Sequence, residues 1–145
     1  MTPDEVKAYV DNLRVPGLIP EEVPVLKAWL LKHYAEYDRV DYNVRLGKGY
    51  DPGPSYPDYA RSMSILNSQY RLDAVAWRGN VATIVECKVR ASASAIGQIL
   101  LYRQLLSKAD TAPASIACVL ACVSRGADVL SLAESADISV ETFAV

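Results

Sequence analysis

The strongest structural signal in the chain lies at residues 70–90, which read YRLDAVAWRGNVATIVECKVR. Two apolar segments flank Arg78-Gly79-Asn80, and a Gly-Asn pair between two apolar runs is typical of a tight β-hairpin. A two-residue turn at Gly79 and Asn80 pairs Arg78 with Val81, so the numbers of paired residues add up to 159. The sequence therefore predicts two antiparallel strands in a fixed register.

Two carboxylates occupy matching positions in this hairpin. Asp73 and Glu86 satisfy the sum of 159, so we expect their Cβ atoms to face each other at about 4.5 to 5.5 Å. Lys88 lies two residues beyond Glu86, and the alternation of a strand places it on the same face. Three charged groups therefore converge on a face whose other members are apolar: Val75, Trp77, Ala82 and Ile84.

Directly opposed carboxylates destabilise a sheet, so something must offset their repulsion. A divalent cation between Asp73 and Glu86 would do so, and hard oxygen ligands suit Mg²⁺ or Mn²⁺. Lys88 beside the ion could hold a water molecule or stabilise negative charge that develops on a phosphate. The alternative is a solvent-exposed ladder of charges without chemistry, and the apolar neighbours favour the first interpretation.

Other kinds of site are excluded by composition. The three cysteines contain no Cys-x-x-Cys pair, which excludes a zinc knuckle and gives no sign of a disulfide framework. The single histidine, His33, rules out multi-histidine metal sites, and its helix-forming neighbours indicate a structural role. Carboxylates, lysine and tyrosine remain as the groups for catalysis.

Length and composition indicate one globular domain over residues 1–145, with 51% hydrophobic and 22% charged residues. The first residues lack the order of a signal peptide, and no apolar run approaches the roughly 20 residues that span a bilayer. We therefore expect a soluble, cytoplasmic protein without a membrane partner.

Periodicity predicts an α/β domain with a mixed sheet flanked by helices. Residues 1–19 form an N-terminal helical extension that breaks at Pro16-Gly17. The elements expected after it are a helix from about Pro20 to Glu36, a strand at 39–46, the two hairpin strands, a helix at 96–106, a strand at 115–123, a helix at 126–135 and a strand at 138–143.

Residues 47–68 are predicted to form a long loop insertion, because Gly and Pro are too frequent through residue 62 for a helix or strand to persist. Loops longer than about 12 to 15 residues are usually functional or disordered. This loop contains Lys48, Arg61 and three tyrosines, Tyr50, Tyr56 and Tyr59. The tyrosines either stack on bases of a nucleic acid or attach the loop to the domain.

Charge is distributed unevenly along the chain, although the formal net charge is only -2. From Arg39 to Lys108 ten basic residues face five acidic ones, a net charge of +5, so both ends are acidic. This distribution fits a polyanionic partner such as DNA, or simply a mixed solvated surface.

Asp73, twelve intervening residues and Glu86-Cys87-Lys88 together resemble the core motif of the PD-(D/E)XK nuclease superfamily, with Leu72 where that motif has proline. The order of elements agrees with the αβββαβ core of that superfamily over roughly residues 20–123, followed here by a further helix and strand. The resemblance implies a restriction-endonuclease-like fold. It also implies a Mg²⁺ or Mn²⁺ ion held by Asp73, Glu86 and the main-chain carbonyl of Cys87.

Gln98 and Tyr102 form a Gln-x-x-x-Tyr pair similar to the extra motif of the RecB-like branch of that superfamily. The spacing puts both on one helix face, and the resemblance implies that they help to position the substrate. The alternative is an ordinary helix with one amide and one half-buried ring.

The superfamily often supplies another carboxylate from its first core helix. Glu22 is the candidate here, and Glu21 and Glu36 compete with it. A favourable charge at a helix N-terminus explains Glu22 equally well.

The expected function is that of a metal-dependent deoxyribonuclease in recombination, repair or phage DNA processing. Arg90 and Arg103 would bind flanking phosphates, and Lys48 would add a further substrate contact. The small size suggests a homo-oligomer or a larger complex, which would be virion-associated if the chain is phage-encoded. The alternative is a catalytically silent nuclease-fold module that binds nucleic acid or serves in assembly, and the sequence does not distinguish DNA from RNA.

Overall fold

The hairpin has the register that the sequence predicts. In the computed structural model, which describes all 145 residues, β2 (Tyr70–Arg78) and β3 (Val81–Arg90) are antiparallel, with Arg78 opposite Val81 and Ala74 opposite Val85. They form the centre of a five-stranded mixed sheet with the order β1-β2-β3-β4-β5. The other strands are β1 (Arg39–Leu46), antiparallel to β2, and β4 (Ser115–Ser124) and β5 (Ile138–Thr142), which continue parallel to β3.

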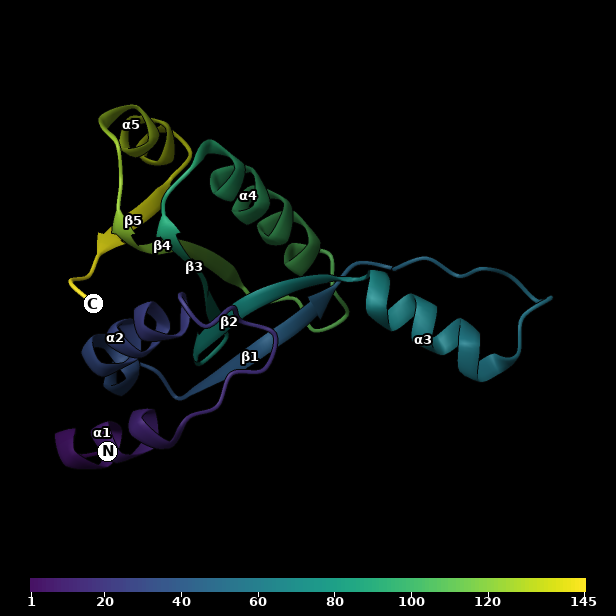
Figure 1. Cartoon of the computed structure of the whole chain (residues 1–145), viewed down its shortest axis with the longest axis horizontal. Helices are drawn as coiled ribbons and strands as arrows, with labels where there is room; N and C mark the ends of the chain where they lie inside the picture. Colours follow the sequence, from purple (N-terminus) through teal and green to yellow (C-terminus); the bar gives the residue numbers. More distant parts are fainter.

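Helices cover both faces of this sheet (Figure 1). On one face lie α1 (Pro3–Asn12) and α2 (Val23–His33), which pack on Ala74, Ala76, Val85 and Cys87. On the other face lie α4 (Ala93–Ser107) and α5 (Ala127–Ser135), over a core that contains Val75, Trp77, Ala82 and Ile84. These four side chains therefore share one apolar face, as the alternation predicts. No helix combines the length and the apolar composition that crossing a bilayer requires.

The second helix starts later than its sequence pattern predicts. Residues before Val23 form turns, and Glu22 is the residue that precedes the first helical turn. The helix ends at His33, and Tyr34–Glu36 continue it as a short 3₁₀ helix, η1. Prolines at positions 20 and 24 explain the late start, because proline is tolerated only in the first turn of a helix.

The strand β1 does not keep all its apolar residues on one face, contrary to the expected alternation. Val40 and Tyr42 pack with the α2 side of the core, whereas Val44 and Leu46 pack with the α4 side. The switch occurs at Asn43, whose φ of 50° lies in the left-handed region. The opposite strand switches at the same level, because Leu72 and Val75 face α4 while Ala74 faces α2.

Residues 47–68 are only partly a loop, so the predicted loop insertion is wrong over its second half. The helix α3 (Asp58–Ser68) occupies that half, because Gly and Pro cluster only up to Pro57 and none follows within the helix. We call residues 47–68 the arm, since it extends away from the sheet beyond the ends of β1 and β2 (Figure 1). None of the residues of α3 is buried.

The arm holds itself together by local contacts. The Asp51 carboxylate accepts two hydrogen bonds from Arg61, at 3.0 and 2.7 Å, and the Ser64 hydroxyl donates to the Tyr50 carbonyl at 2.8 Å. Gly49, with a φ of 66°, passes so close to the Ile65 carbonyl that any Cβ there would clash. The rings of Tyr50, Tyr56 and Tyr59 are exposed, so they do not attach the arm to the domain.

We predict that Asn43→Val lowers the free energy of unfolding by about 1 to 2 kcal/mol relative to Asn43→Gly, because a β-branched residue does not tolerate a positive φ whereas glycine does. Urea denaturation of both variants measures the difference. Equal stability of the two would contradict the left-handed switch in β1.

Candidate active site

The strands β2 and β3 separate in the middle of the sheet. Their pairing ends at Ala74 opposite Val85, although both strands continue beyond that point. There β2 pairs only with β1, and β3 pairs only with β4. We call this opening the fork, and Asp73 and Glu86 are the first residues inside it.

Side chains replace the missing backbone pairing in the fork. The Asp73 N–H donates to Glu86 Oε1 at 3.3 Å, and the Cys87 N–H donates to Asp73 Oδ2 at 2.8 Å. Each carboxylate therefore satisfies a backbone donor of the opposite strand that would otherwise be left without a partner. The structure thus brings together the two carboxylates that the register pairs.

Burial strongly perturbs both carboxyl groups. Glu86 is only 3% exposed, and burial raises its pKa to about 9, with the nearby charge of Asp73 adding to the rise. Burial also raises the pKa of Asp73, while hydrogen bonds from Glu86 and from the Cys87 N–H oppose that rise. The pair therefore keeps a proton at neutral pH, which the Glu86 carboxyl group can donate to Asp73.

Lys88 supplies the positive charge of the site. It lies half-buried, and its charge opposes the rise in pKa of Asp73, of Glu86 and of Glu22. It forms no ion pair with any carboxylate. The ammonium group is therefore free to interact with a further anionic group.

Of the three glutamates that the sequence leaves open, Glu22 is the one that responds to the charges of the fork. Burial raises its pKa, the charge of Lys88 lowers it and that of Asp73 raises it further, so Glu22 lies within electrostatic range of both. Glu21 is exposed, and the Glu36 carboxylate instead contacts His33 Nδ1 at 2.5 Å. The ring of His33 also packs against Trp29, with centroids 5.0 Å apart, which agrees with the structural role that the sequence predicts.

The helix α4 presents the Gln-x-x-x-Tyr pair to the same region. Tyr102 is 6% exposed, and burial raises its pKa to about 12, with the charges of Glu86 and Asp73 adding to the rise. Its ring therefore lies within electrostatic range of the carboxylates. One turn earlier on the same face, Gln98 has a buried Oε1 without any hydrogen-bond partner. Such an orphaned acceptor requires a donor, which a ligand or water can supply.

The donor set fits a hard divalent cation in its chemistry. The buried Glu86 and half-buried Asp73 carboxyl groups form no ion pair with a cationic side chain, so their oxygens would stabilise a bound Mg²⁺ or Mn²⁺ ion. The predicted set of Asp73, Glu86 and the Cys87 carbonyl contains only two side chains. No group of three or more His, Cys, Asp or Glu side chains is suitably placed to hold an ion.

The predicted cationic contacts lie in three different places. Arg90 is exposed at the end of β3, on the same alternating face as Lys88. Lys48 is exposed at the start of the arm. Arg103 points elsewhere and donates to the Ala136 carbonyl at 3.4 Å, in the turn after α5. The structure therefore does not bring Arg103 to the carboxylates, because one residue beyond Tyr102 lies about 100° further around the helix.

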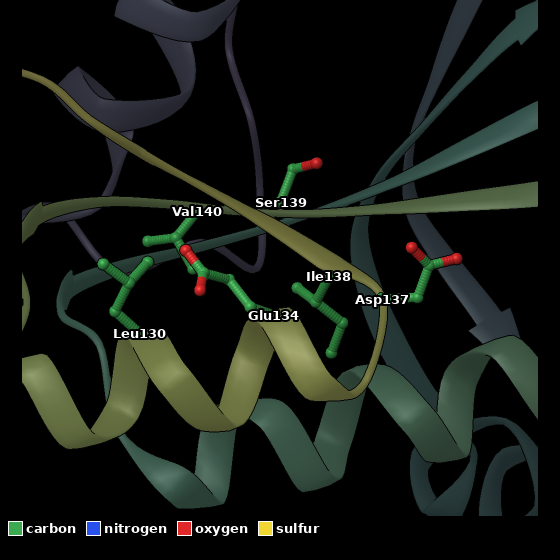
Figure 2. Close-up of a pocket in the computed structure, with 6 residues that line it drawn as sticks. All are labelled: Leu130, Glu134, Asp137, Ile138, Ser139 and Val140. Carbon is green, nitrogen blue, oxygen red and sulfur yellow. The ribbon is translucent and has the colours of Figure 1, made fainter.

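A hollow of about 370 Å³ between α5 and β5 is separate from the fork. Figure 2 shows that its two acidic side chains, Glu134 and Asp137, point in different directions. They do not form a converging pair like Asp73 and Glu86. The fork is therefore the better candidate for chemistry.

No sequence motif identifies Arg45, Lys108 or Tyr70 as a site residue. Arg45 and Lys108 line one groove with Lys48, and Tyr70 lies between that groove and the fork. The excess of basic residues in the middle of the chain is the only sequence feature that bears on them. Their proximity depends on tertiary packing of the end of α4 against the end of β1.

Comparisons with known proteins add no name to this site. No family model, no curated protein and no solved structure matches the chain. The geometry and electrostatics of the fork are therefore the evidence for what this site does.

We predict that the free energy of unfolding in EDTA falls as the pH rises from about 5 to about 9. Unfolded Glu86 ionises near its ordinary pKa of 4.5, whereas the folded protein keeps its proton to about pH 9. The folded state therefore binds more protons in this window, which gives a negative slope of at most about 1.4 kcal/mol per pH unit from this group.

Urea unfolding at several pH values, compared between the wild type and Glu86→Gln, isolates this contribution. In the variant, the free energy of unfolding is expected to fall less between about pH 5 and about pH 9, because the contribution of Glu86 is absent. The same decline in both proteins would contradict a shared proton in the fork.

Proposed function

We propose that this chain is a metal-dependent nuclease that hydrolyses phosphodiester bonds of DNA. The observation that carries the proposal is the fork, where the buried Glu86 carboxyl group and the half-buried Asp73 carboxyl group meet near Lys88, a lysine without an ionic partner. The motif of Asp73 and Glu86-Cys87-Lys88 supports it, as does the order α2, β1, β2, β3, α4 and β4, in which the arm with α3 is inserted between β1 and β2. We therefore propose membership of the PD-(D/E)XK superfamily, with its restriction-endonuclease-like fold.

In this proposal Asp73, Glu86 and the Cys87 carbonyl would hold Mg²⁺ or Mn²⁺. The ion, when bound, supplies positive charge that polarises the scissile phosphate and lowers the pKa of a water molecule. Binding it requires the carboxyl pair to give up its shared proton. Glu22, which lies within electrostatic range of Asp73 and Lys88, would add a contact through water.

Lys88 has the central role among the remaining residues. Its free ammonium group would orient the attacking water or donate hydrogen bonds to the phosphate oxygen on which negative charge develops. Tyr102 and Gln98 would position the substrate from α4, with the orphaned Gln98 Oε1 accepting a hydrogen bond from it. Arg90, on the same strand face as Lys88, would bind a flanking phosphate.

A second candidate function is assembly by a catalytically silent module of the same fold. One observation favours it: Tyr59, Met63 and Leu66 recur at helical spacing on α3, and all three are exposed. An apolar stripe on a projecting helix suits a protein partner, such as another copy of the chain or a larger complex. Either function would fit recombination, repair or phage DNA processing.

Cleavage of linear, nicked and branched DNA tests the proposal. We expect cleavage in Mg²⁺ or Mn²⁺ and none in EDTA, and a loss on the order of 100-fold or more in Asp73→Asn and in Lys88→Ala. Asp137→Asn is the matched control, because it removes a carboxylate outside the fork at a φ of 60° that asparagine tolerates. We expect it to cleave like the wild type.

Cleavage that persists in EDTA, or that survives Asp73→Asn, would exclude the fork as the active site. A wild type that binds DNA without cleaving it in either metal would favour the silent module.

A further inference from the structure

A basic groove of about 730 Å³ lies where the end of β1 meets the end of α4. Its charged lining consists of Arg45, Lys48 and Lys108 against the single acid Asp110, so the groove is positive. Arg45 also donates to the Leu66 carbonyl at 2.5 Å, which joins the groove to the base of the arm. Figure 1 shows the arm, the end of β1 and one end of α4 meeting on the same side of the molecule.

Two tyrosines connect this groove to the fork. Gly47 lines the groove and lies against Tyr70, because a Cβ on Gly47 would be 3.5 Å from the Tyr70 ring. The ring of Tyr70 is in turn 6.4 Å from that of Tyr102, centroid to centroid. Tyr102 lies within electrostatic range of the Asp73–Glu86 pair. Neighbouring side chains therefore connect the groove, through Tyr70 and Tyr102, to the region of the carboxylates.

Of the two tyrosines, Tyr70 is the one that is open to a ligand. Its side chain is 50% exposed, whereas Tyr102 beside it is buried. A half-exposed ring next to a cationic groove suits an unpaired base, since a base within a duplex is already stacked on its neighbours. The lysines suit the phosphates that connect successive bases. Further along, the exposed ring of Tyr59 on the arm offers another stacking surface.

We propose that the groove and Tyr70 form a track for single-stranded DNA, which leads one strand to the Asp73–Glu86 pair. Phosphates lie along Lys48 and Lys108, and a base stacks on Tyr70. The inference rests on the proposed function and adds a substrate class: DNA with a single-stranded end or segment, rather than uniform duplex.

The test measures binding of a fluorescently labelled oligothymidylate by anisotropy in EDTA, so that affinity is measured without cleavage. Tyr70→Ala is expected to weaken binding roughly 5- to 100-fold, the range for loss of one stacked base, and Tyr70→Trp to restore it. The double variant Lys48→Ala/Lys108→Ala is expected to bind more weakly. It should also lower the slope of log K against log salt by about 1.4, for two phosphate contacts on a single strand.

Arg78→Ala is the matched control. Arg78 is an exposed cation at the hairpin turn, at the other end of β2 from Tyr70, so its loss removes one charge without touching the groove. We expect its affinity for the oligothymidylate to stay within about twofold of the wild type. Unlabelled duplex of the same length should compete more weakly than the single strand.

Wild-type affinity in both the tyrosine and the double lysine variants would overturn the track, as would a wild type that does not bind the oligothymidylate or binds duplex equally well. These outcomes are independent of catalysis. A protein that cleaves DNA while its groove variants bind normally remains a nuclease without this track. A protein that binds through the groove but never cleaves keeps the track and loses the proposed activity.

Discussion

Hydrogen bonds between the Asp73 and Glu86 side chains and the backbone of the opposite strand hold the centre of the sheet together where β2 and β3 separate. Strands that part inside a protein leave N–H groups without partners, and an unpaired buried donor costs about 1 to 3 kcal/mol. Carboxylates satisfy these donors and keep the fork open. The same placement removes the carboxylates from water, which raises the pKa of both groups. One constraint therefore explains the local architecture and the electrostatics of the site.

The surrounding elements are arranged around this opening. The switch of side-chain direction at Asn43 in β1 lies at the level where β2 and β3 separate, so Leu72 and Val75 can both pack under α4. The charges of the fork act on Tyr102 of α4 and on Glu22, the residue that precedes α2 in the other helical layer. The site therefore combines residues from both helical layers with two strands of the sheet between them.

Much of this could be predicted from local sequence, because the Gly79-Asn80 turn fixes the register that pairs Asp73 with Glu86. The order of the other helices and strands, α3 excepted, could be predicted because hydrophobic periodicity is also a local property of the sequence. The helix α3 was not predicted, because the frequent glycines and prolines before Asp58 made the whole segment resemble a loop. The direction of Arg103 and the basic groove depend on how α4 lies across the sheet. Partial burial and the charges of the fork distinguish Glu22 from Glu21 and Glu36, and both depend on the folded structure.

The proposed nuclease requires the fork to bind a divalent cation, and anomalous scattering from crystals soaked in Mn²⁺ would locate that ion. Soaking at alkaline pH favours loss of the shared proton from the carboxyl pair. The account predicts an anomalous peak between the carboxylates of Asp73 and Glu86, within coordination distance of the Cys87 carbonyl. A fork without a peak at saturating Mn²⁺, with both carboxylates still bonded to the opposite strands, would contradict it.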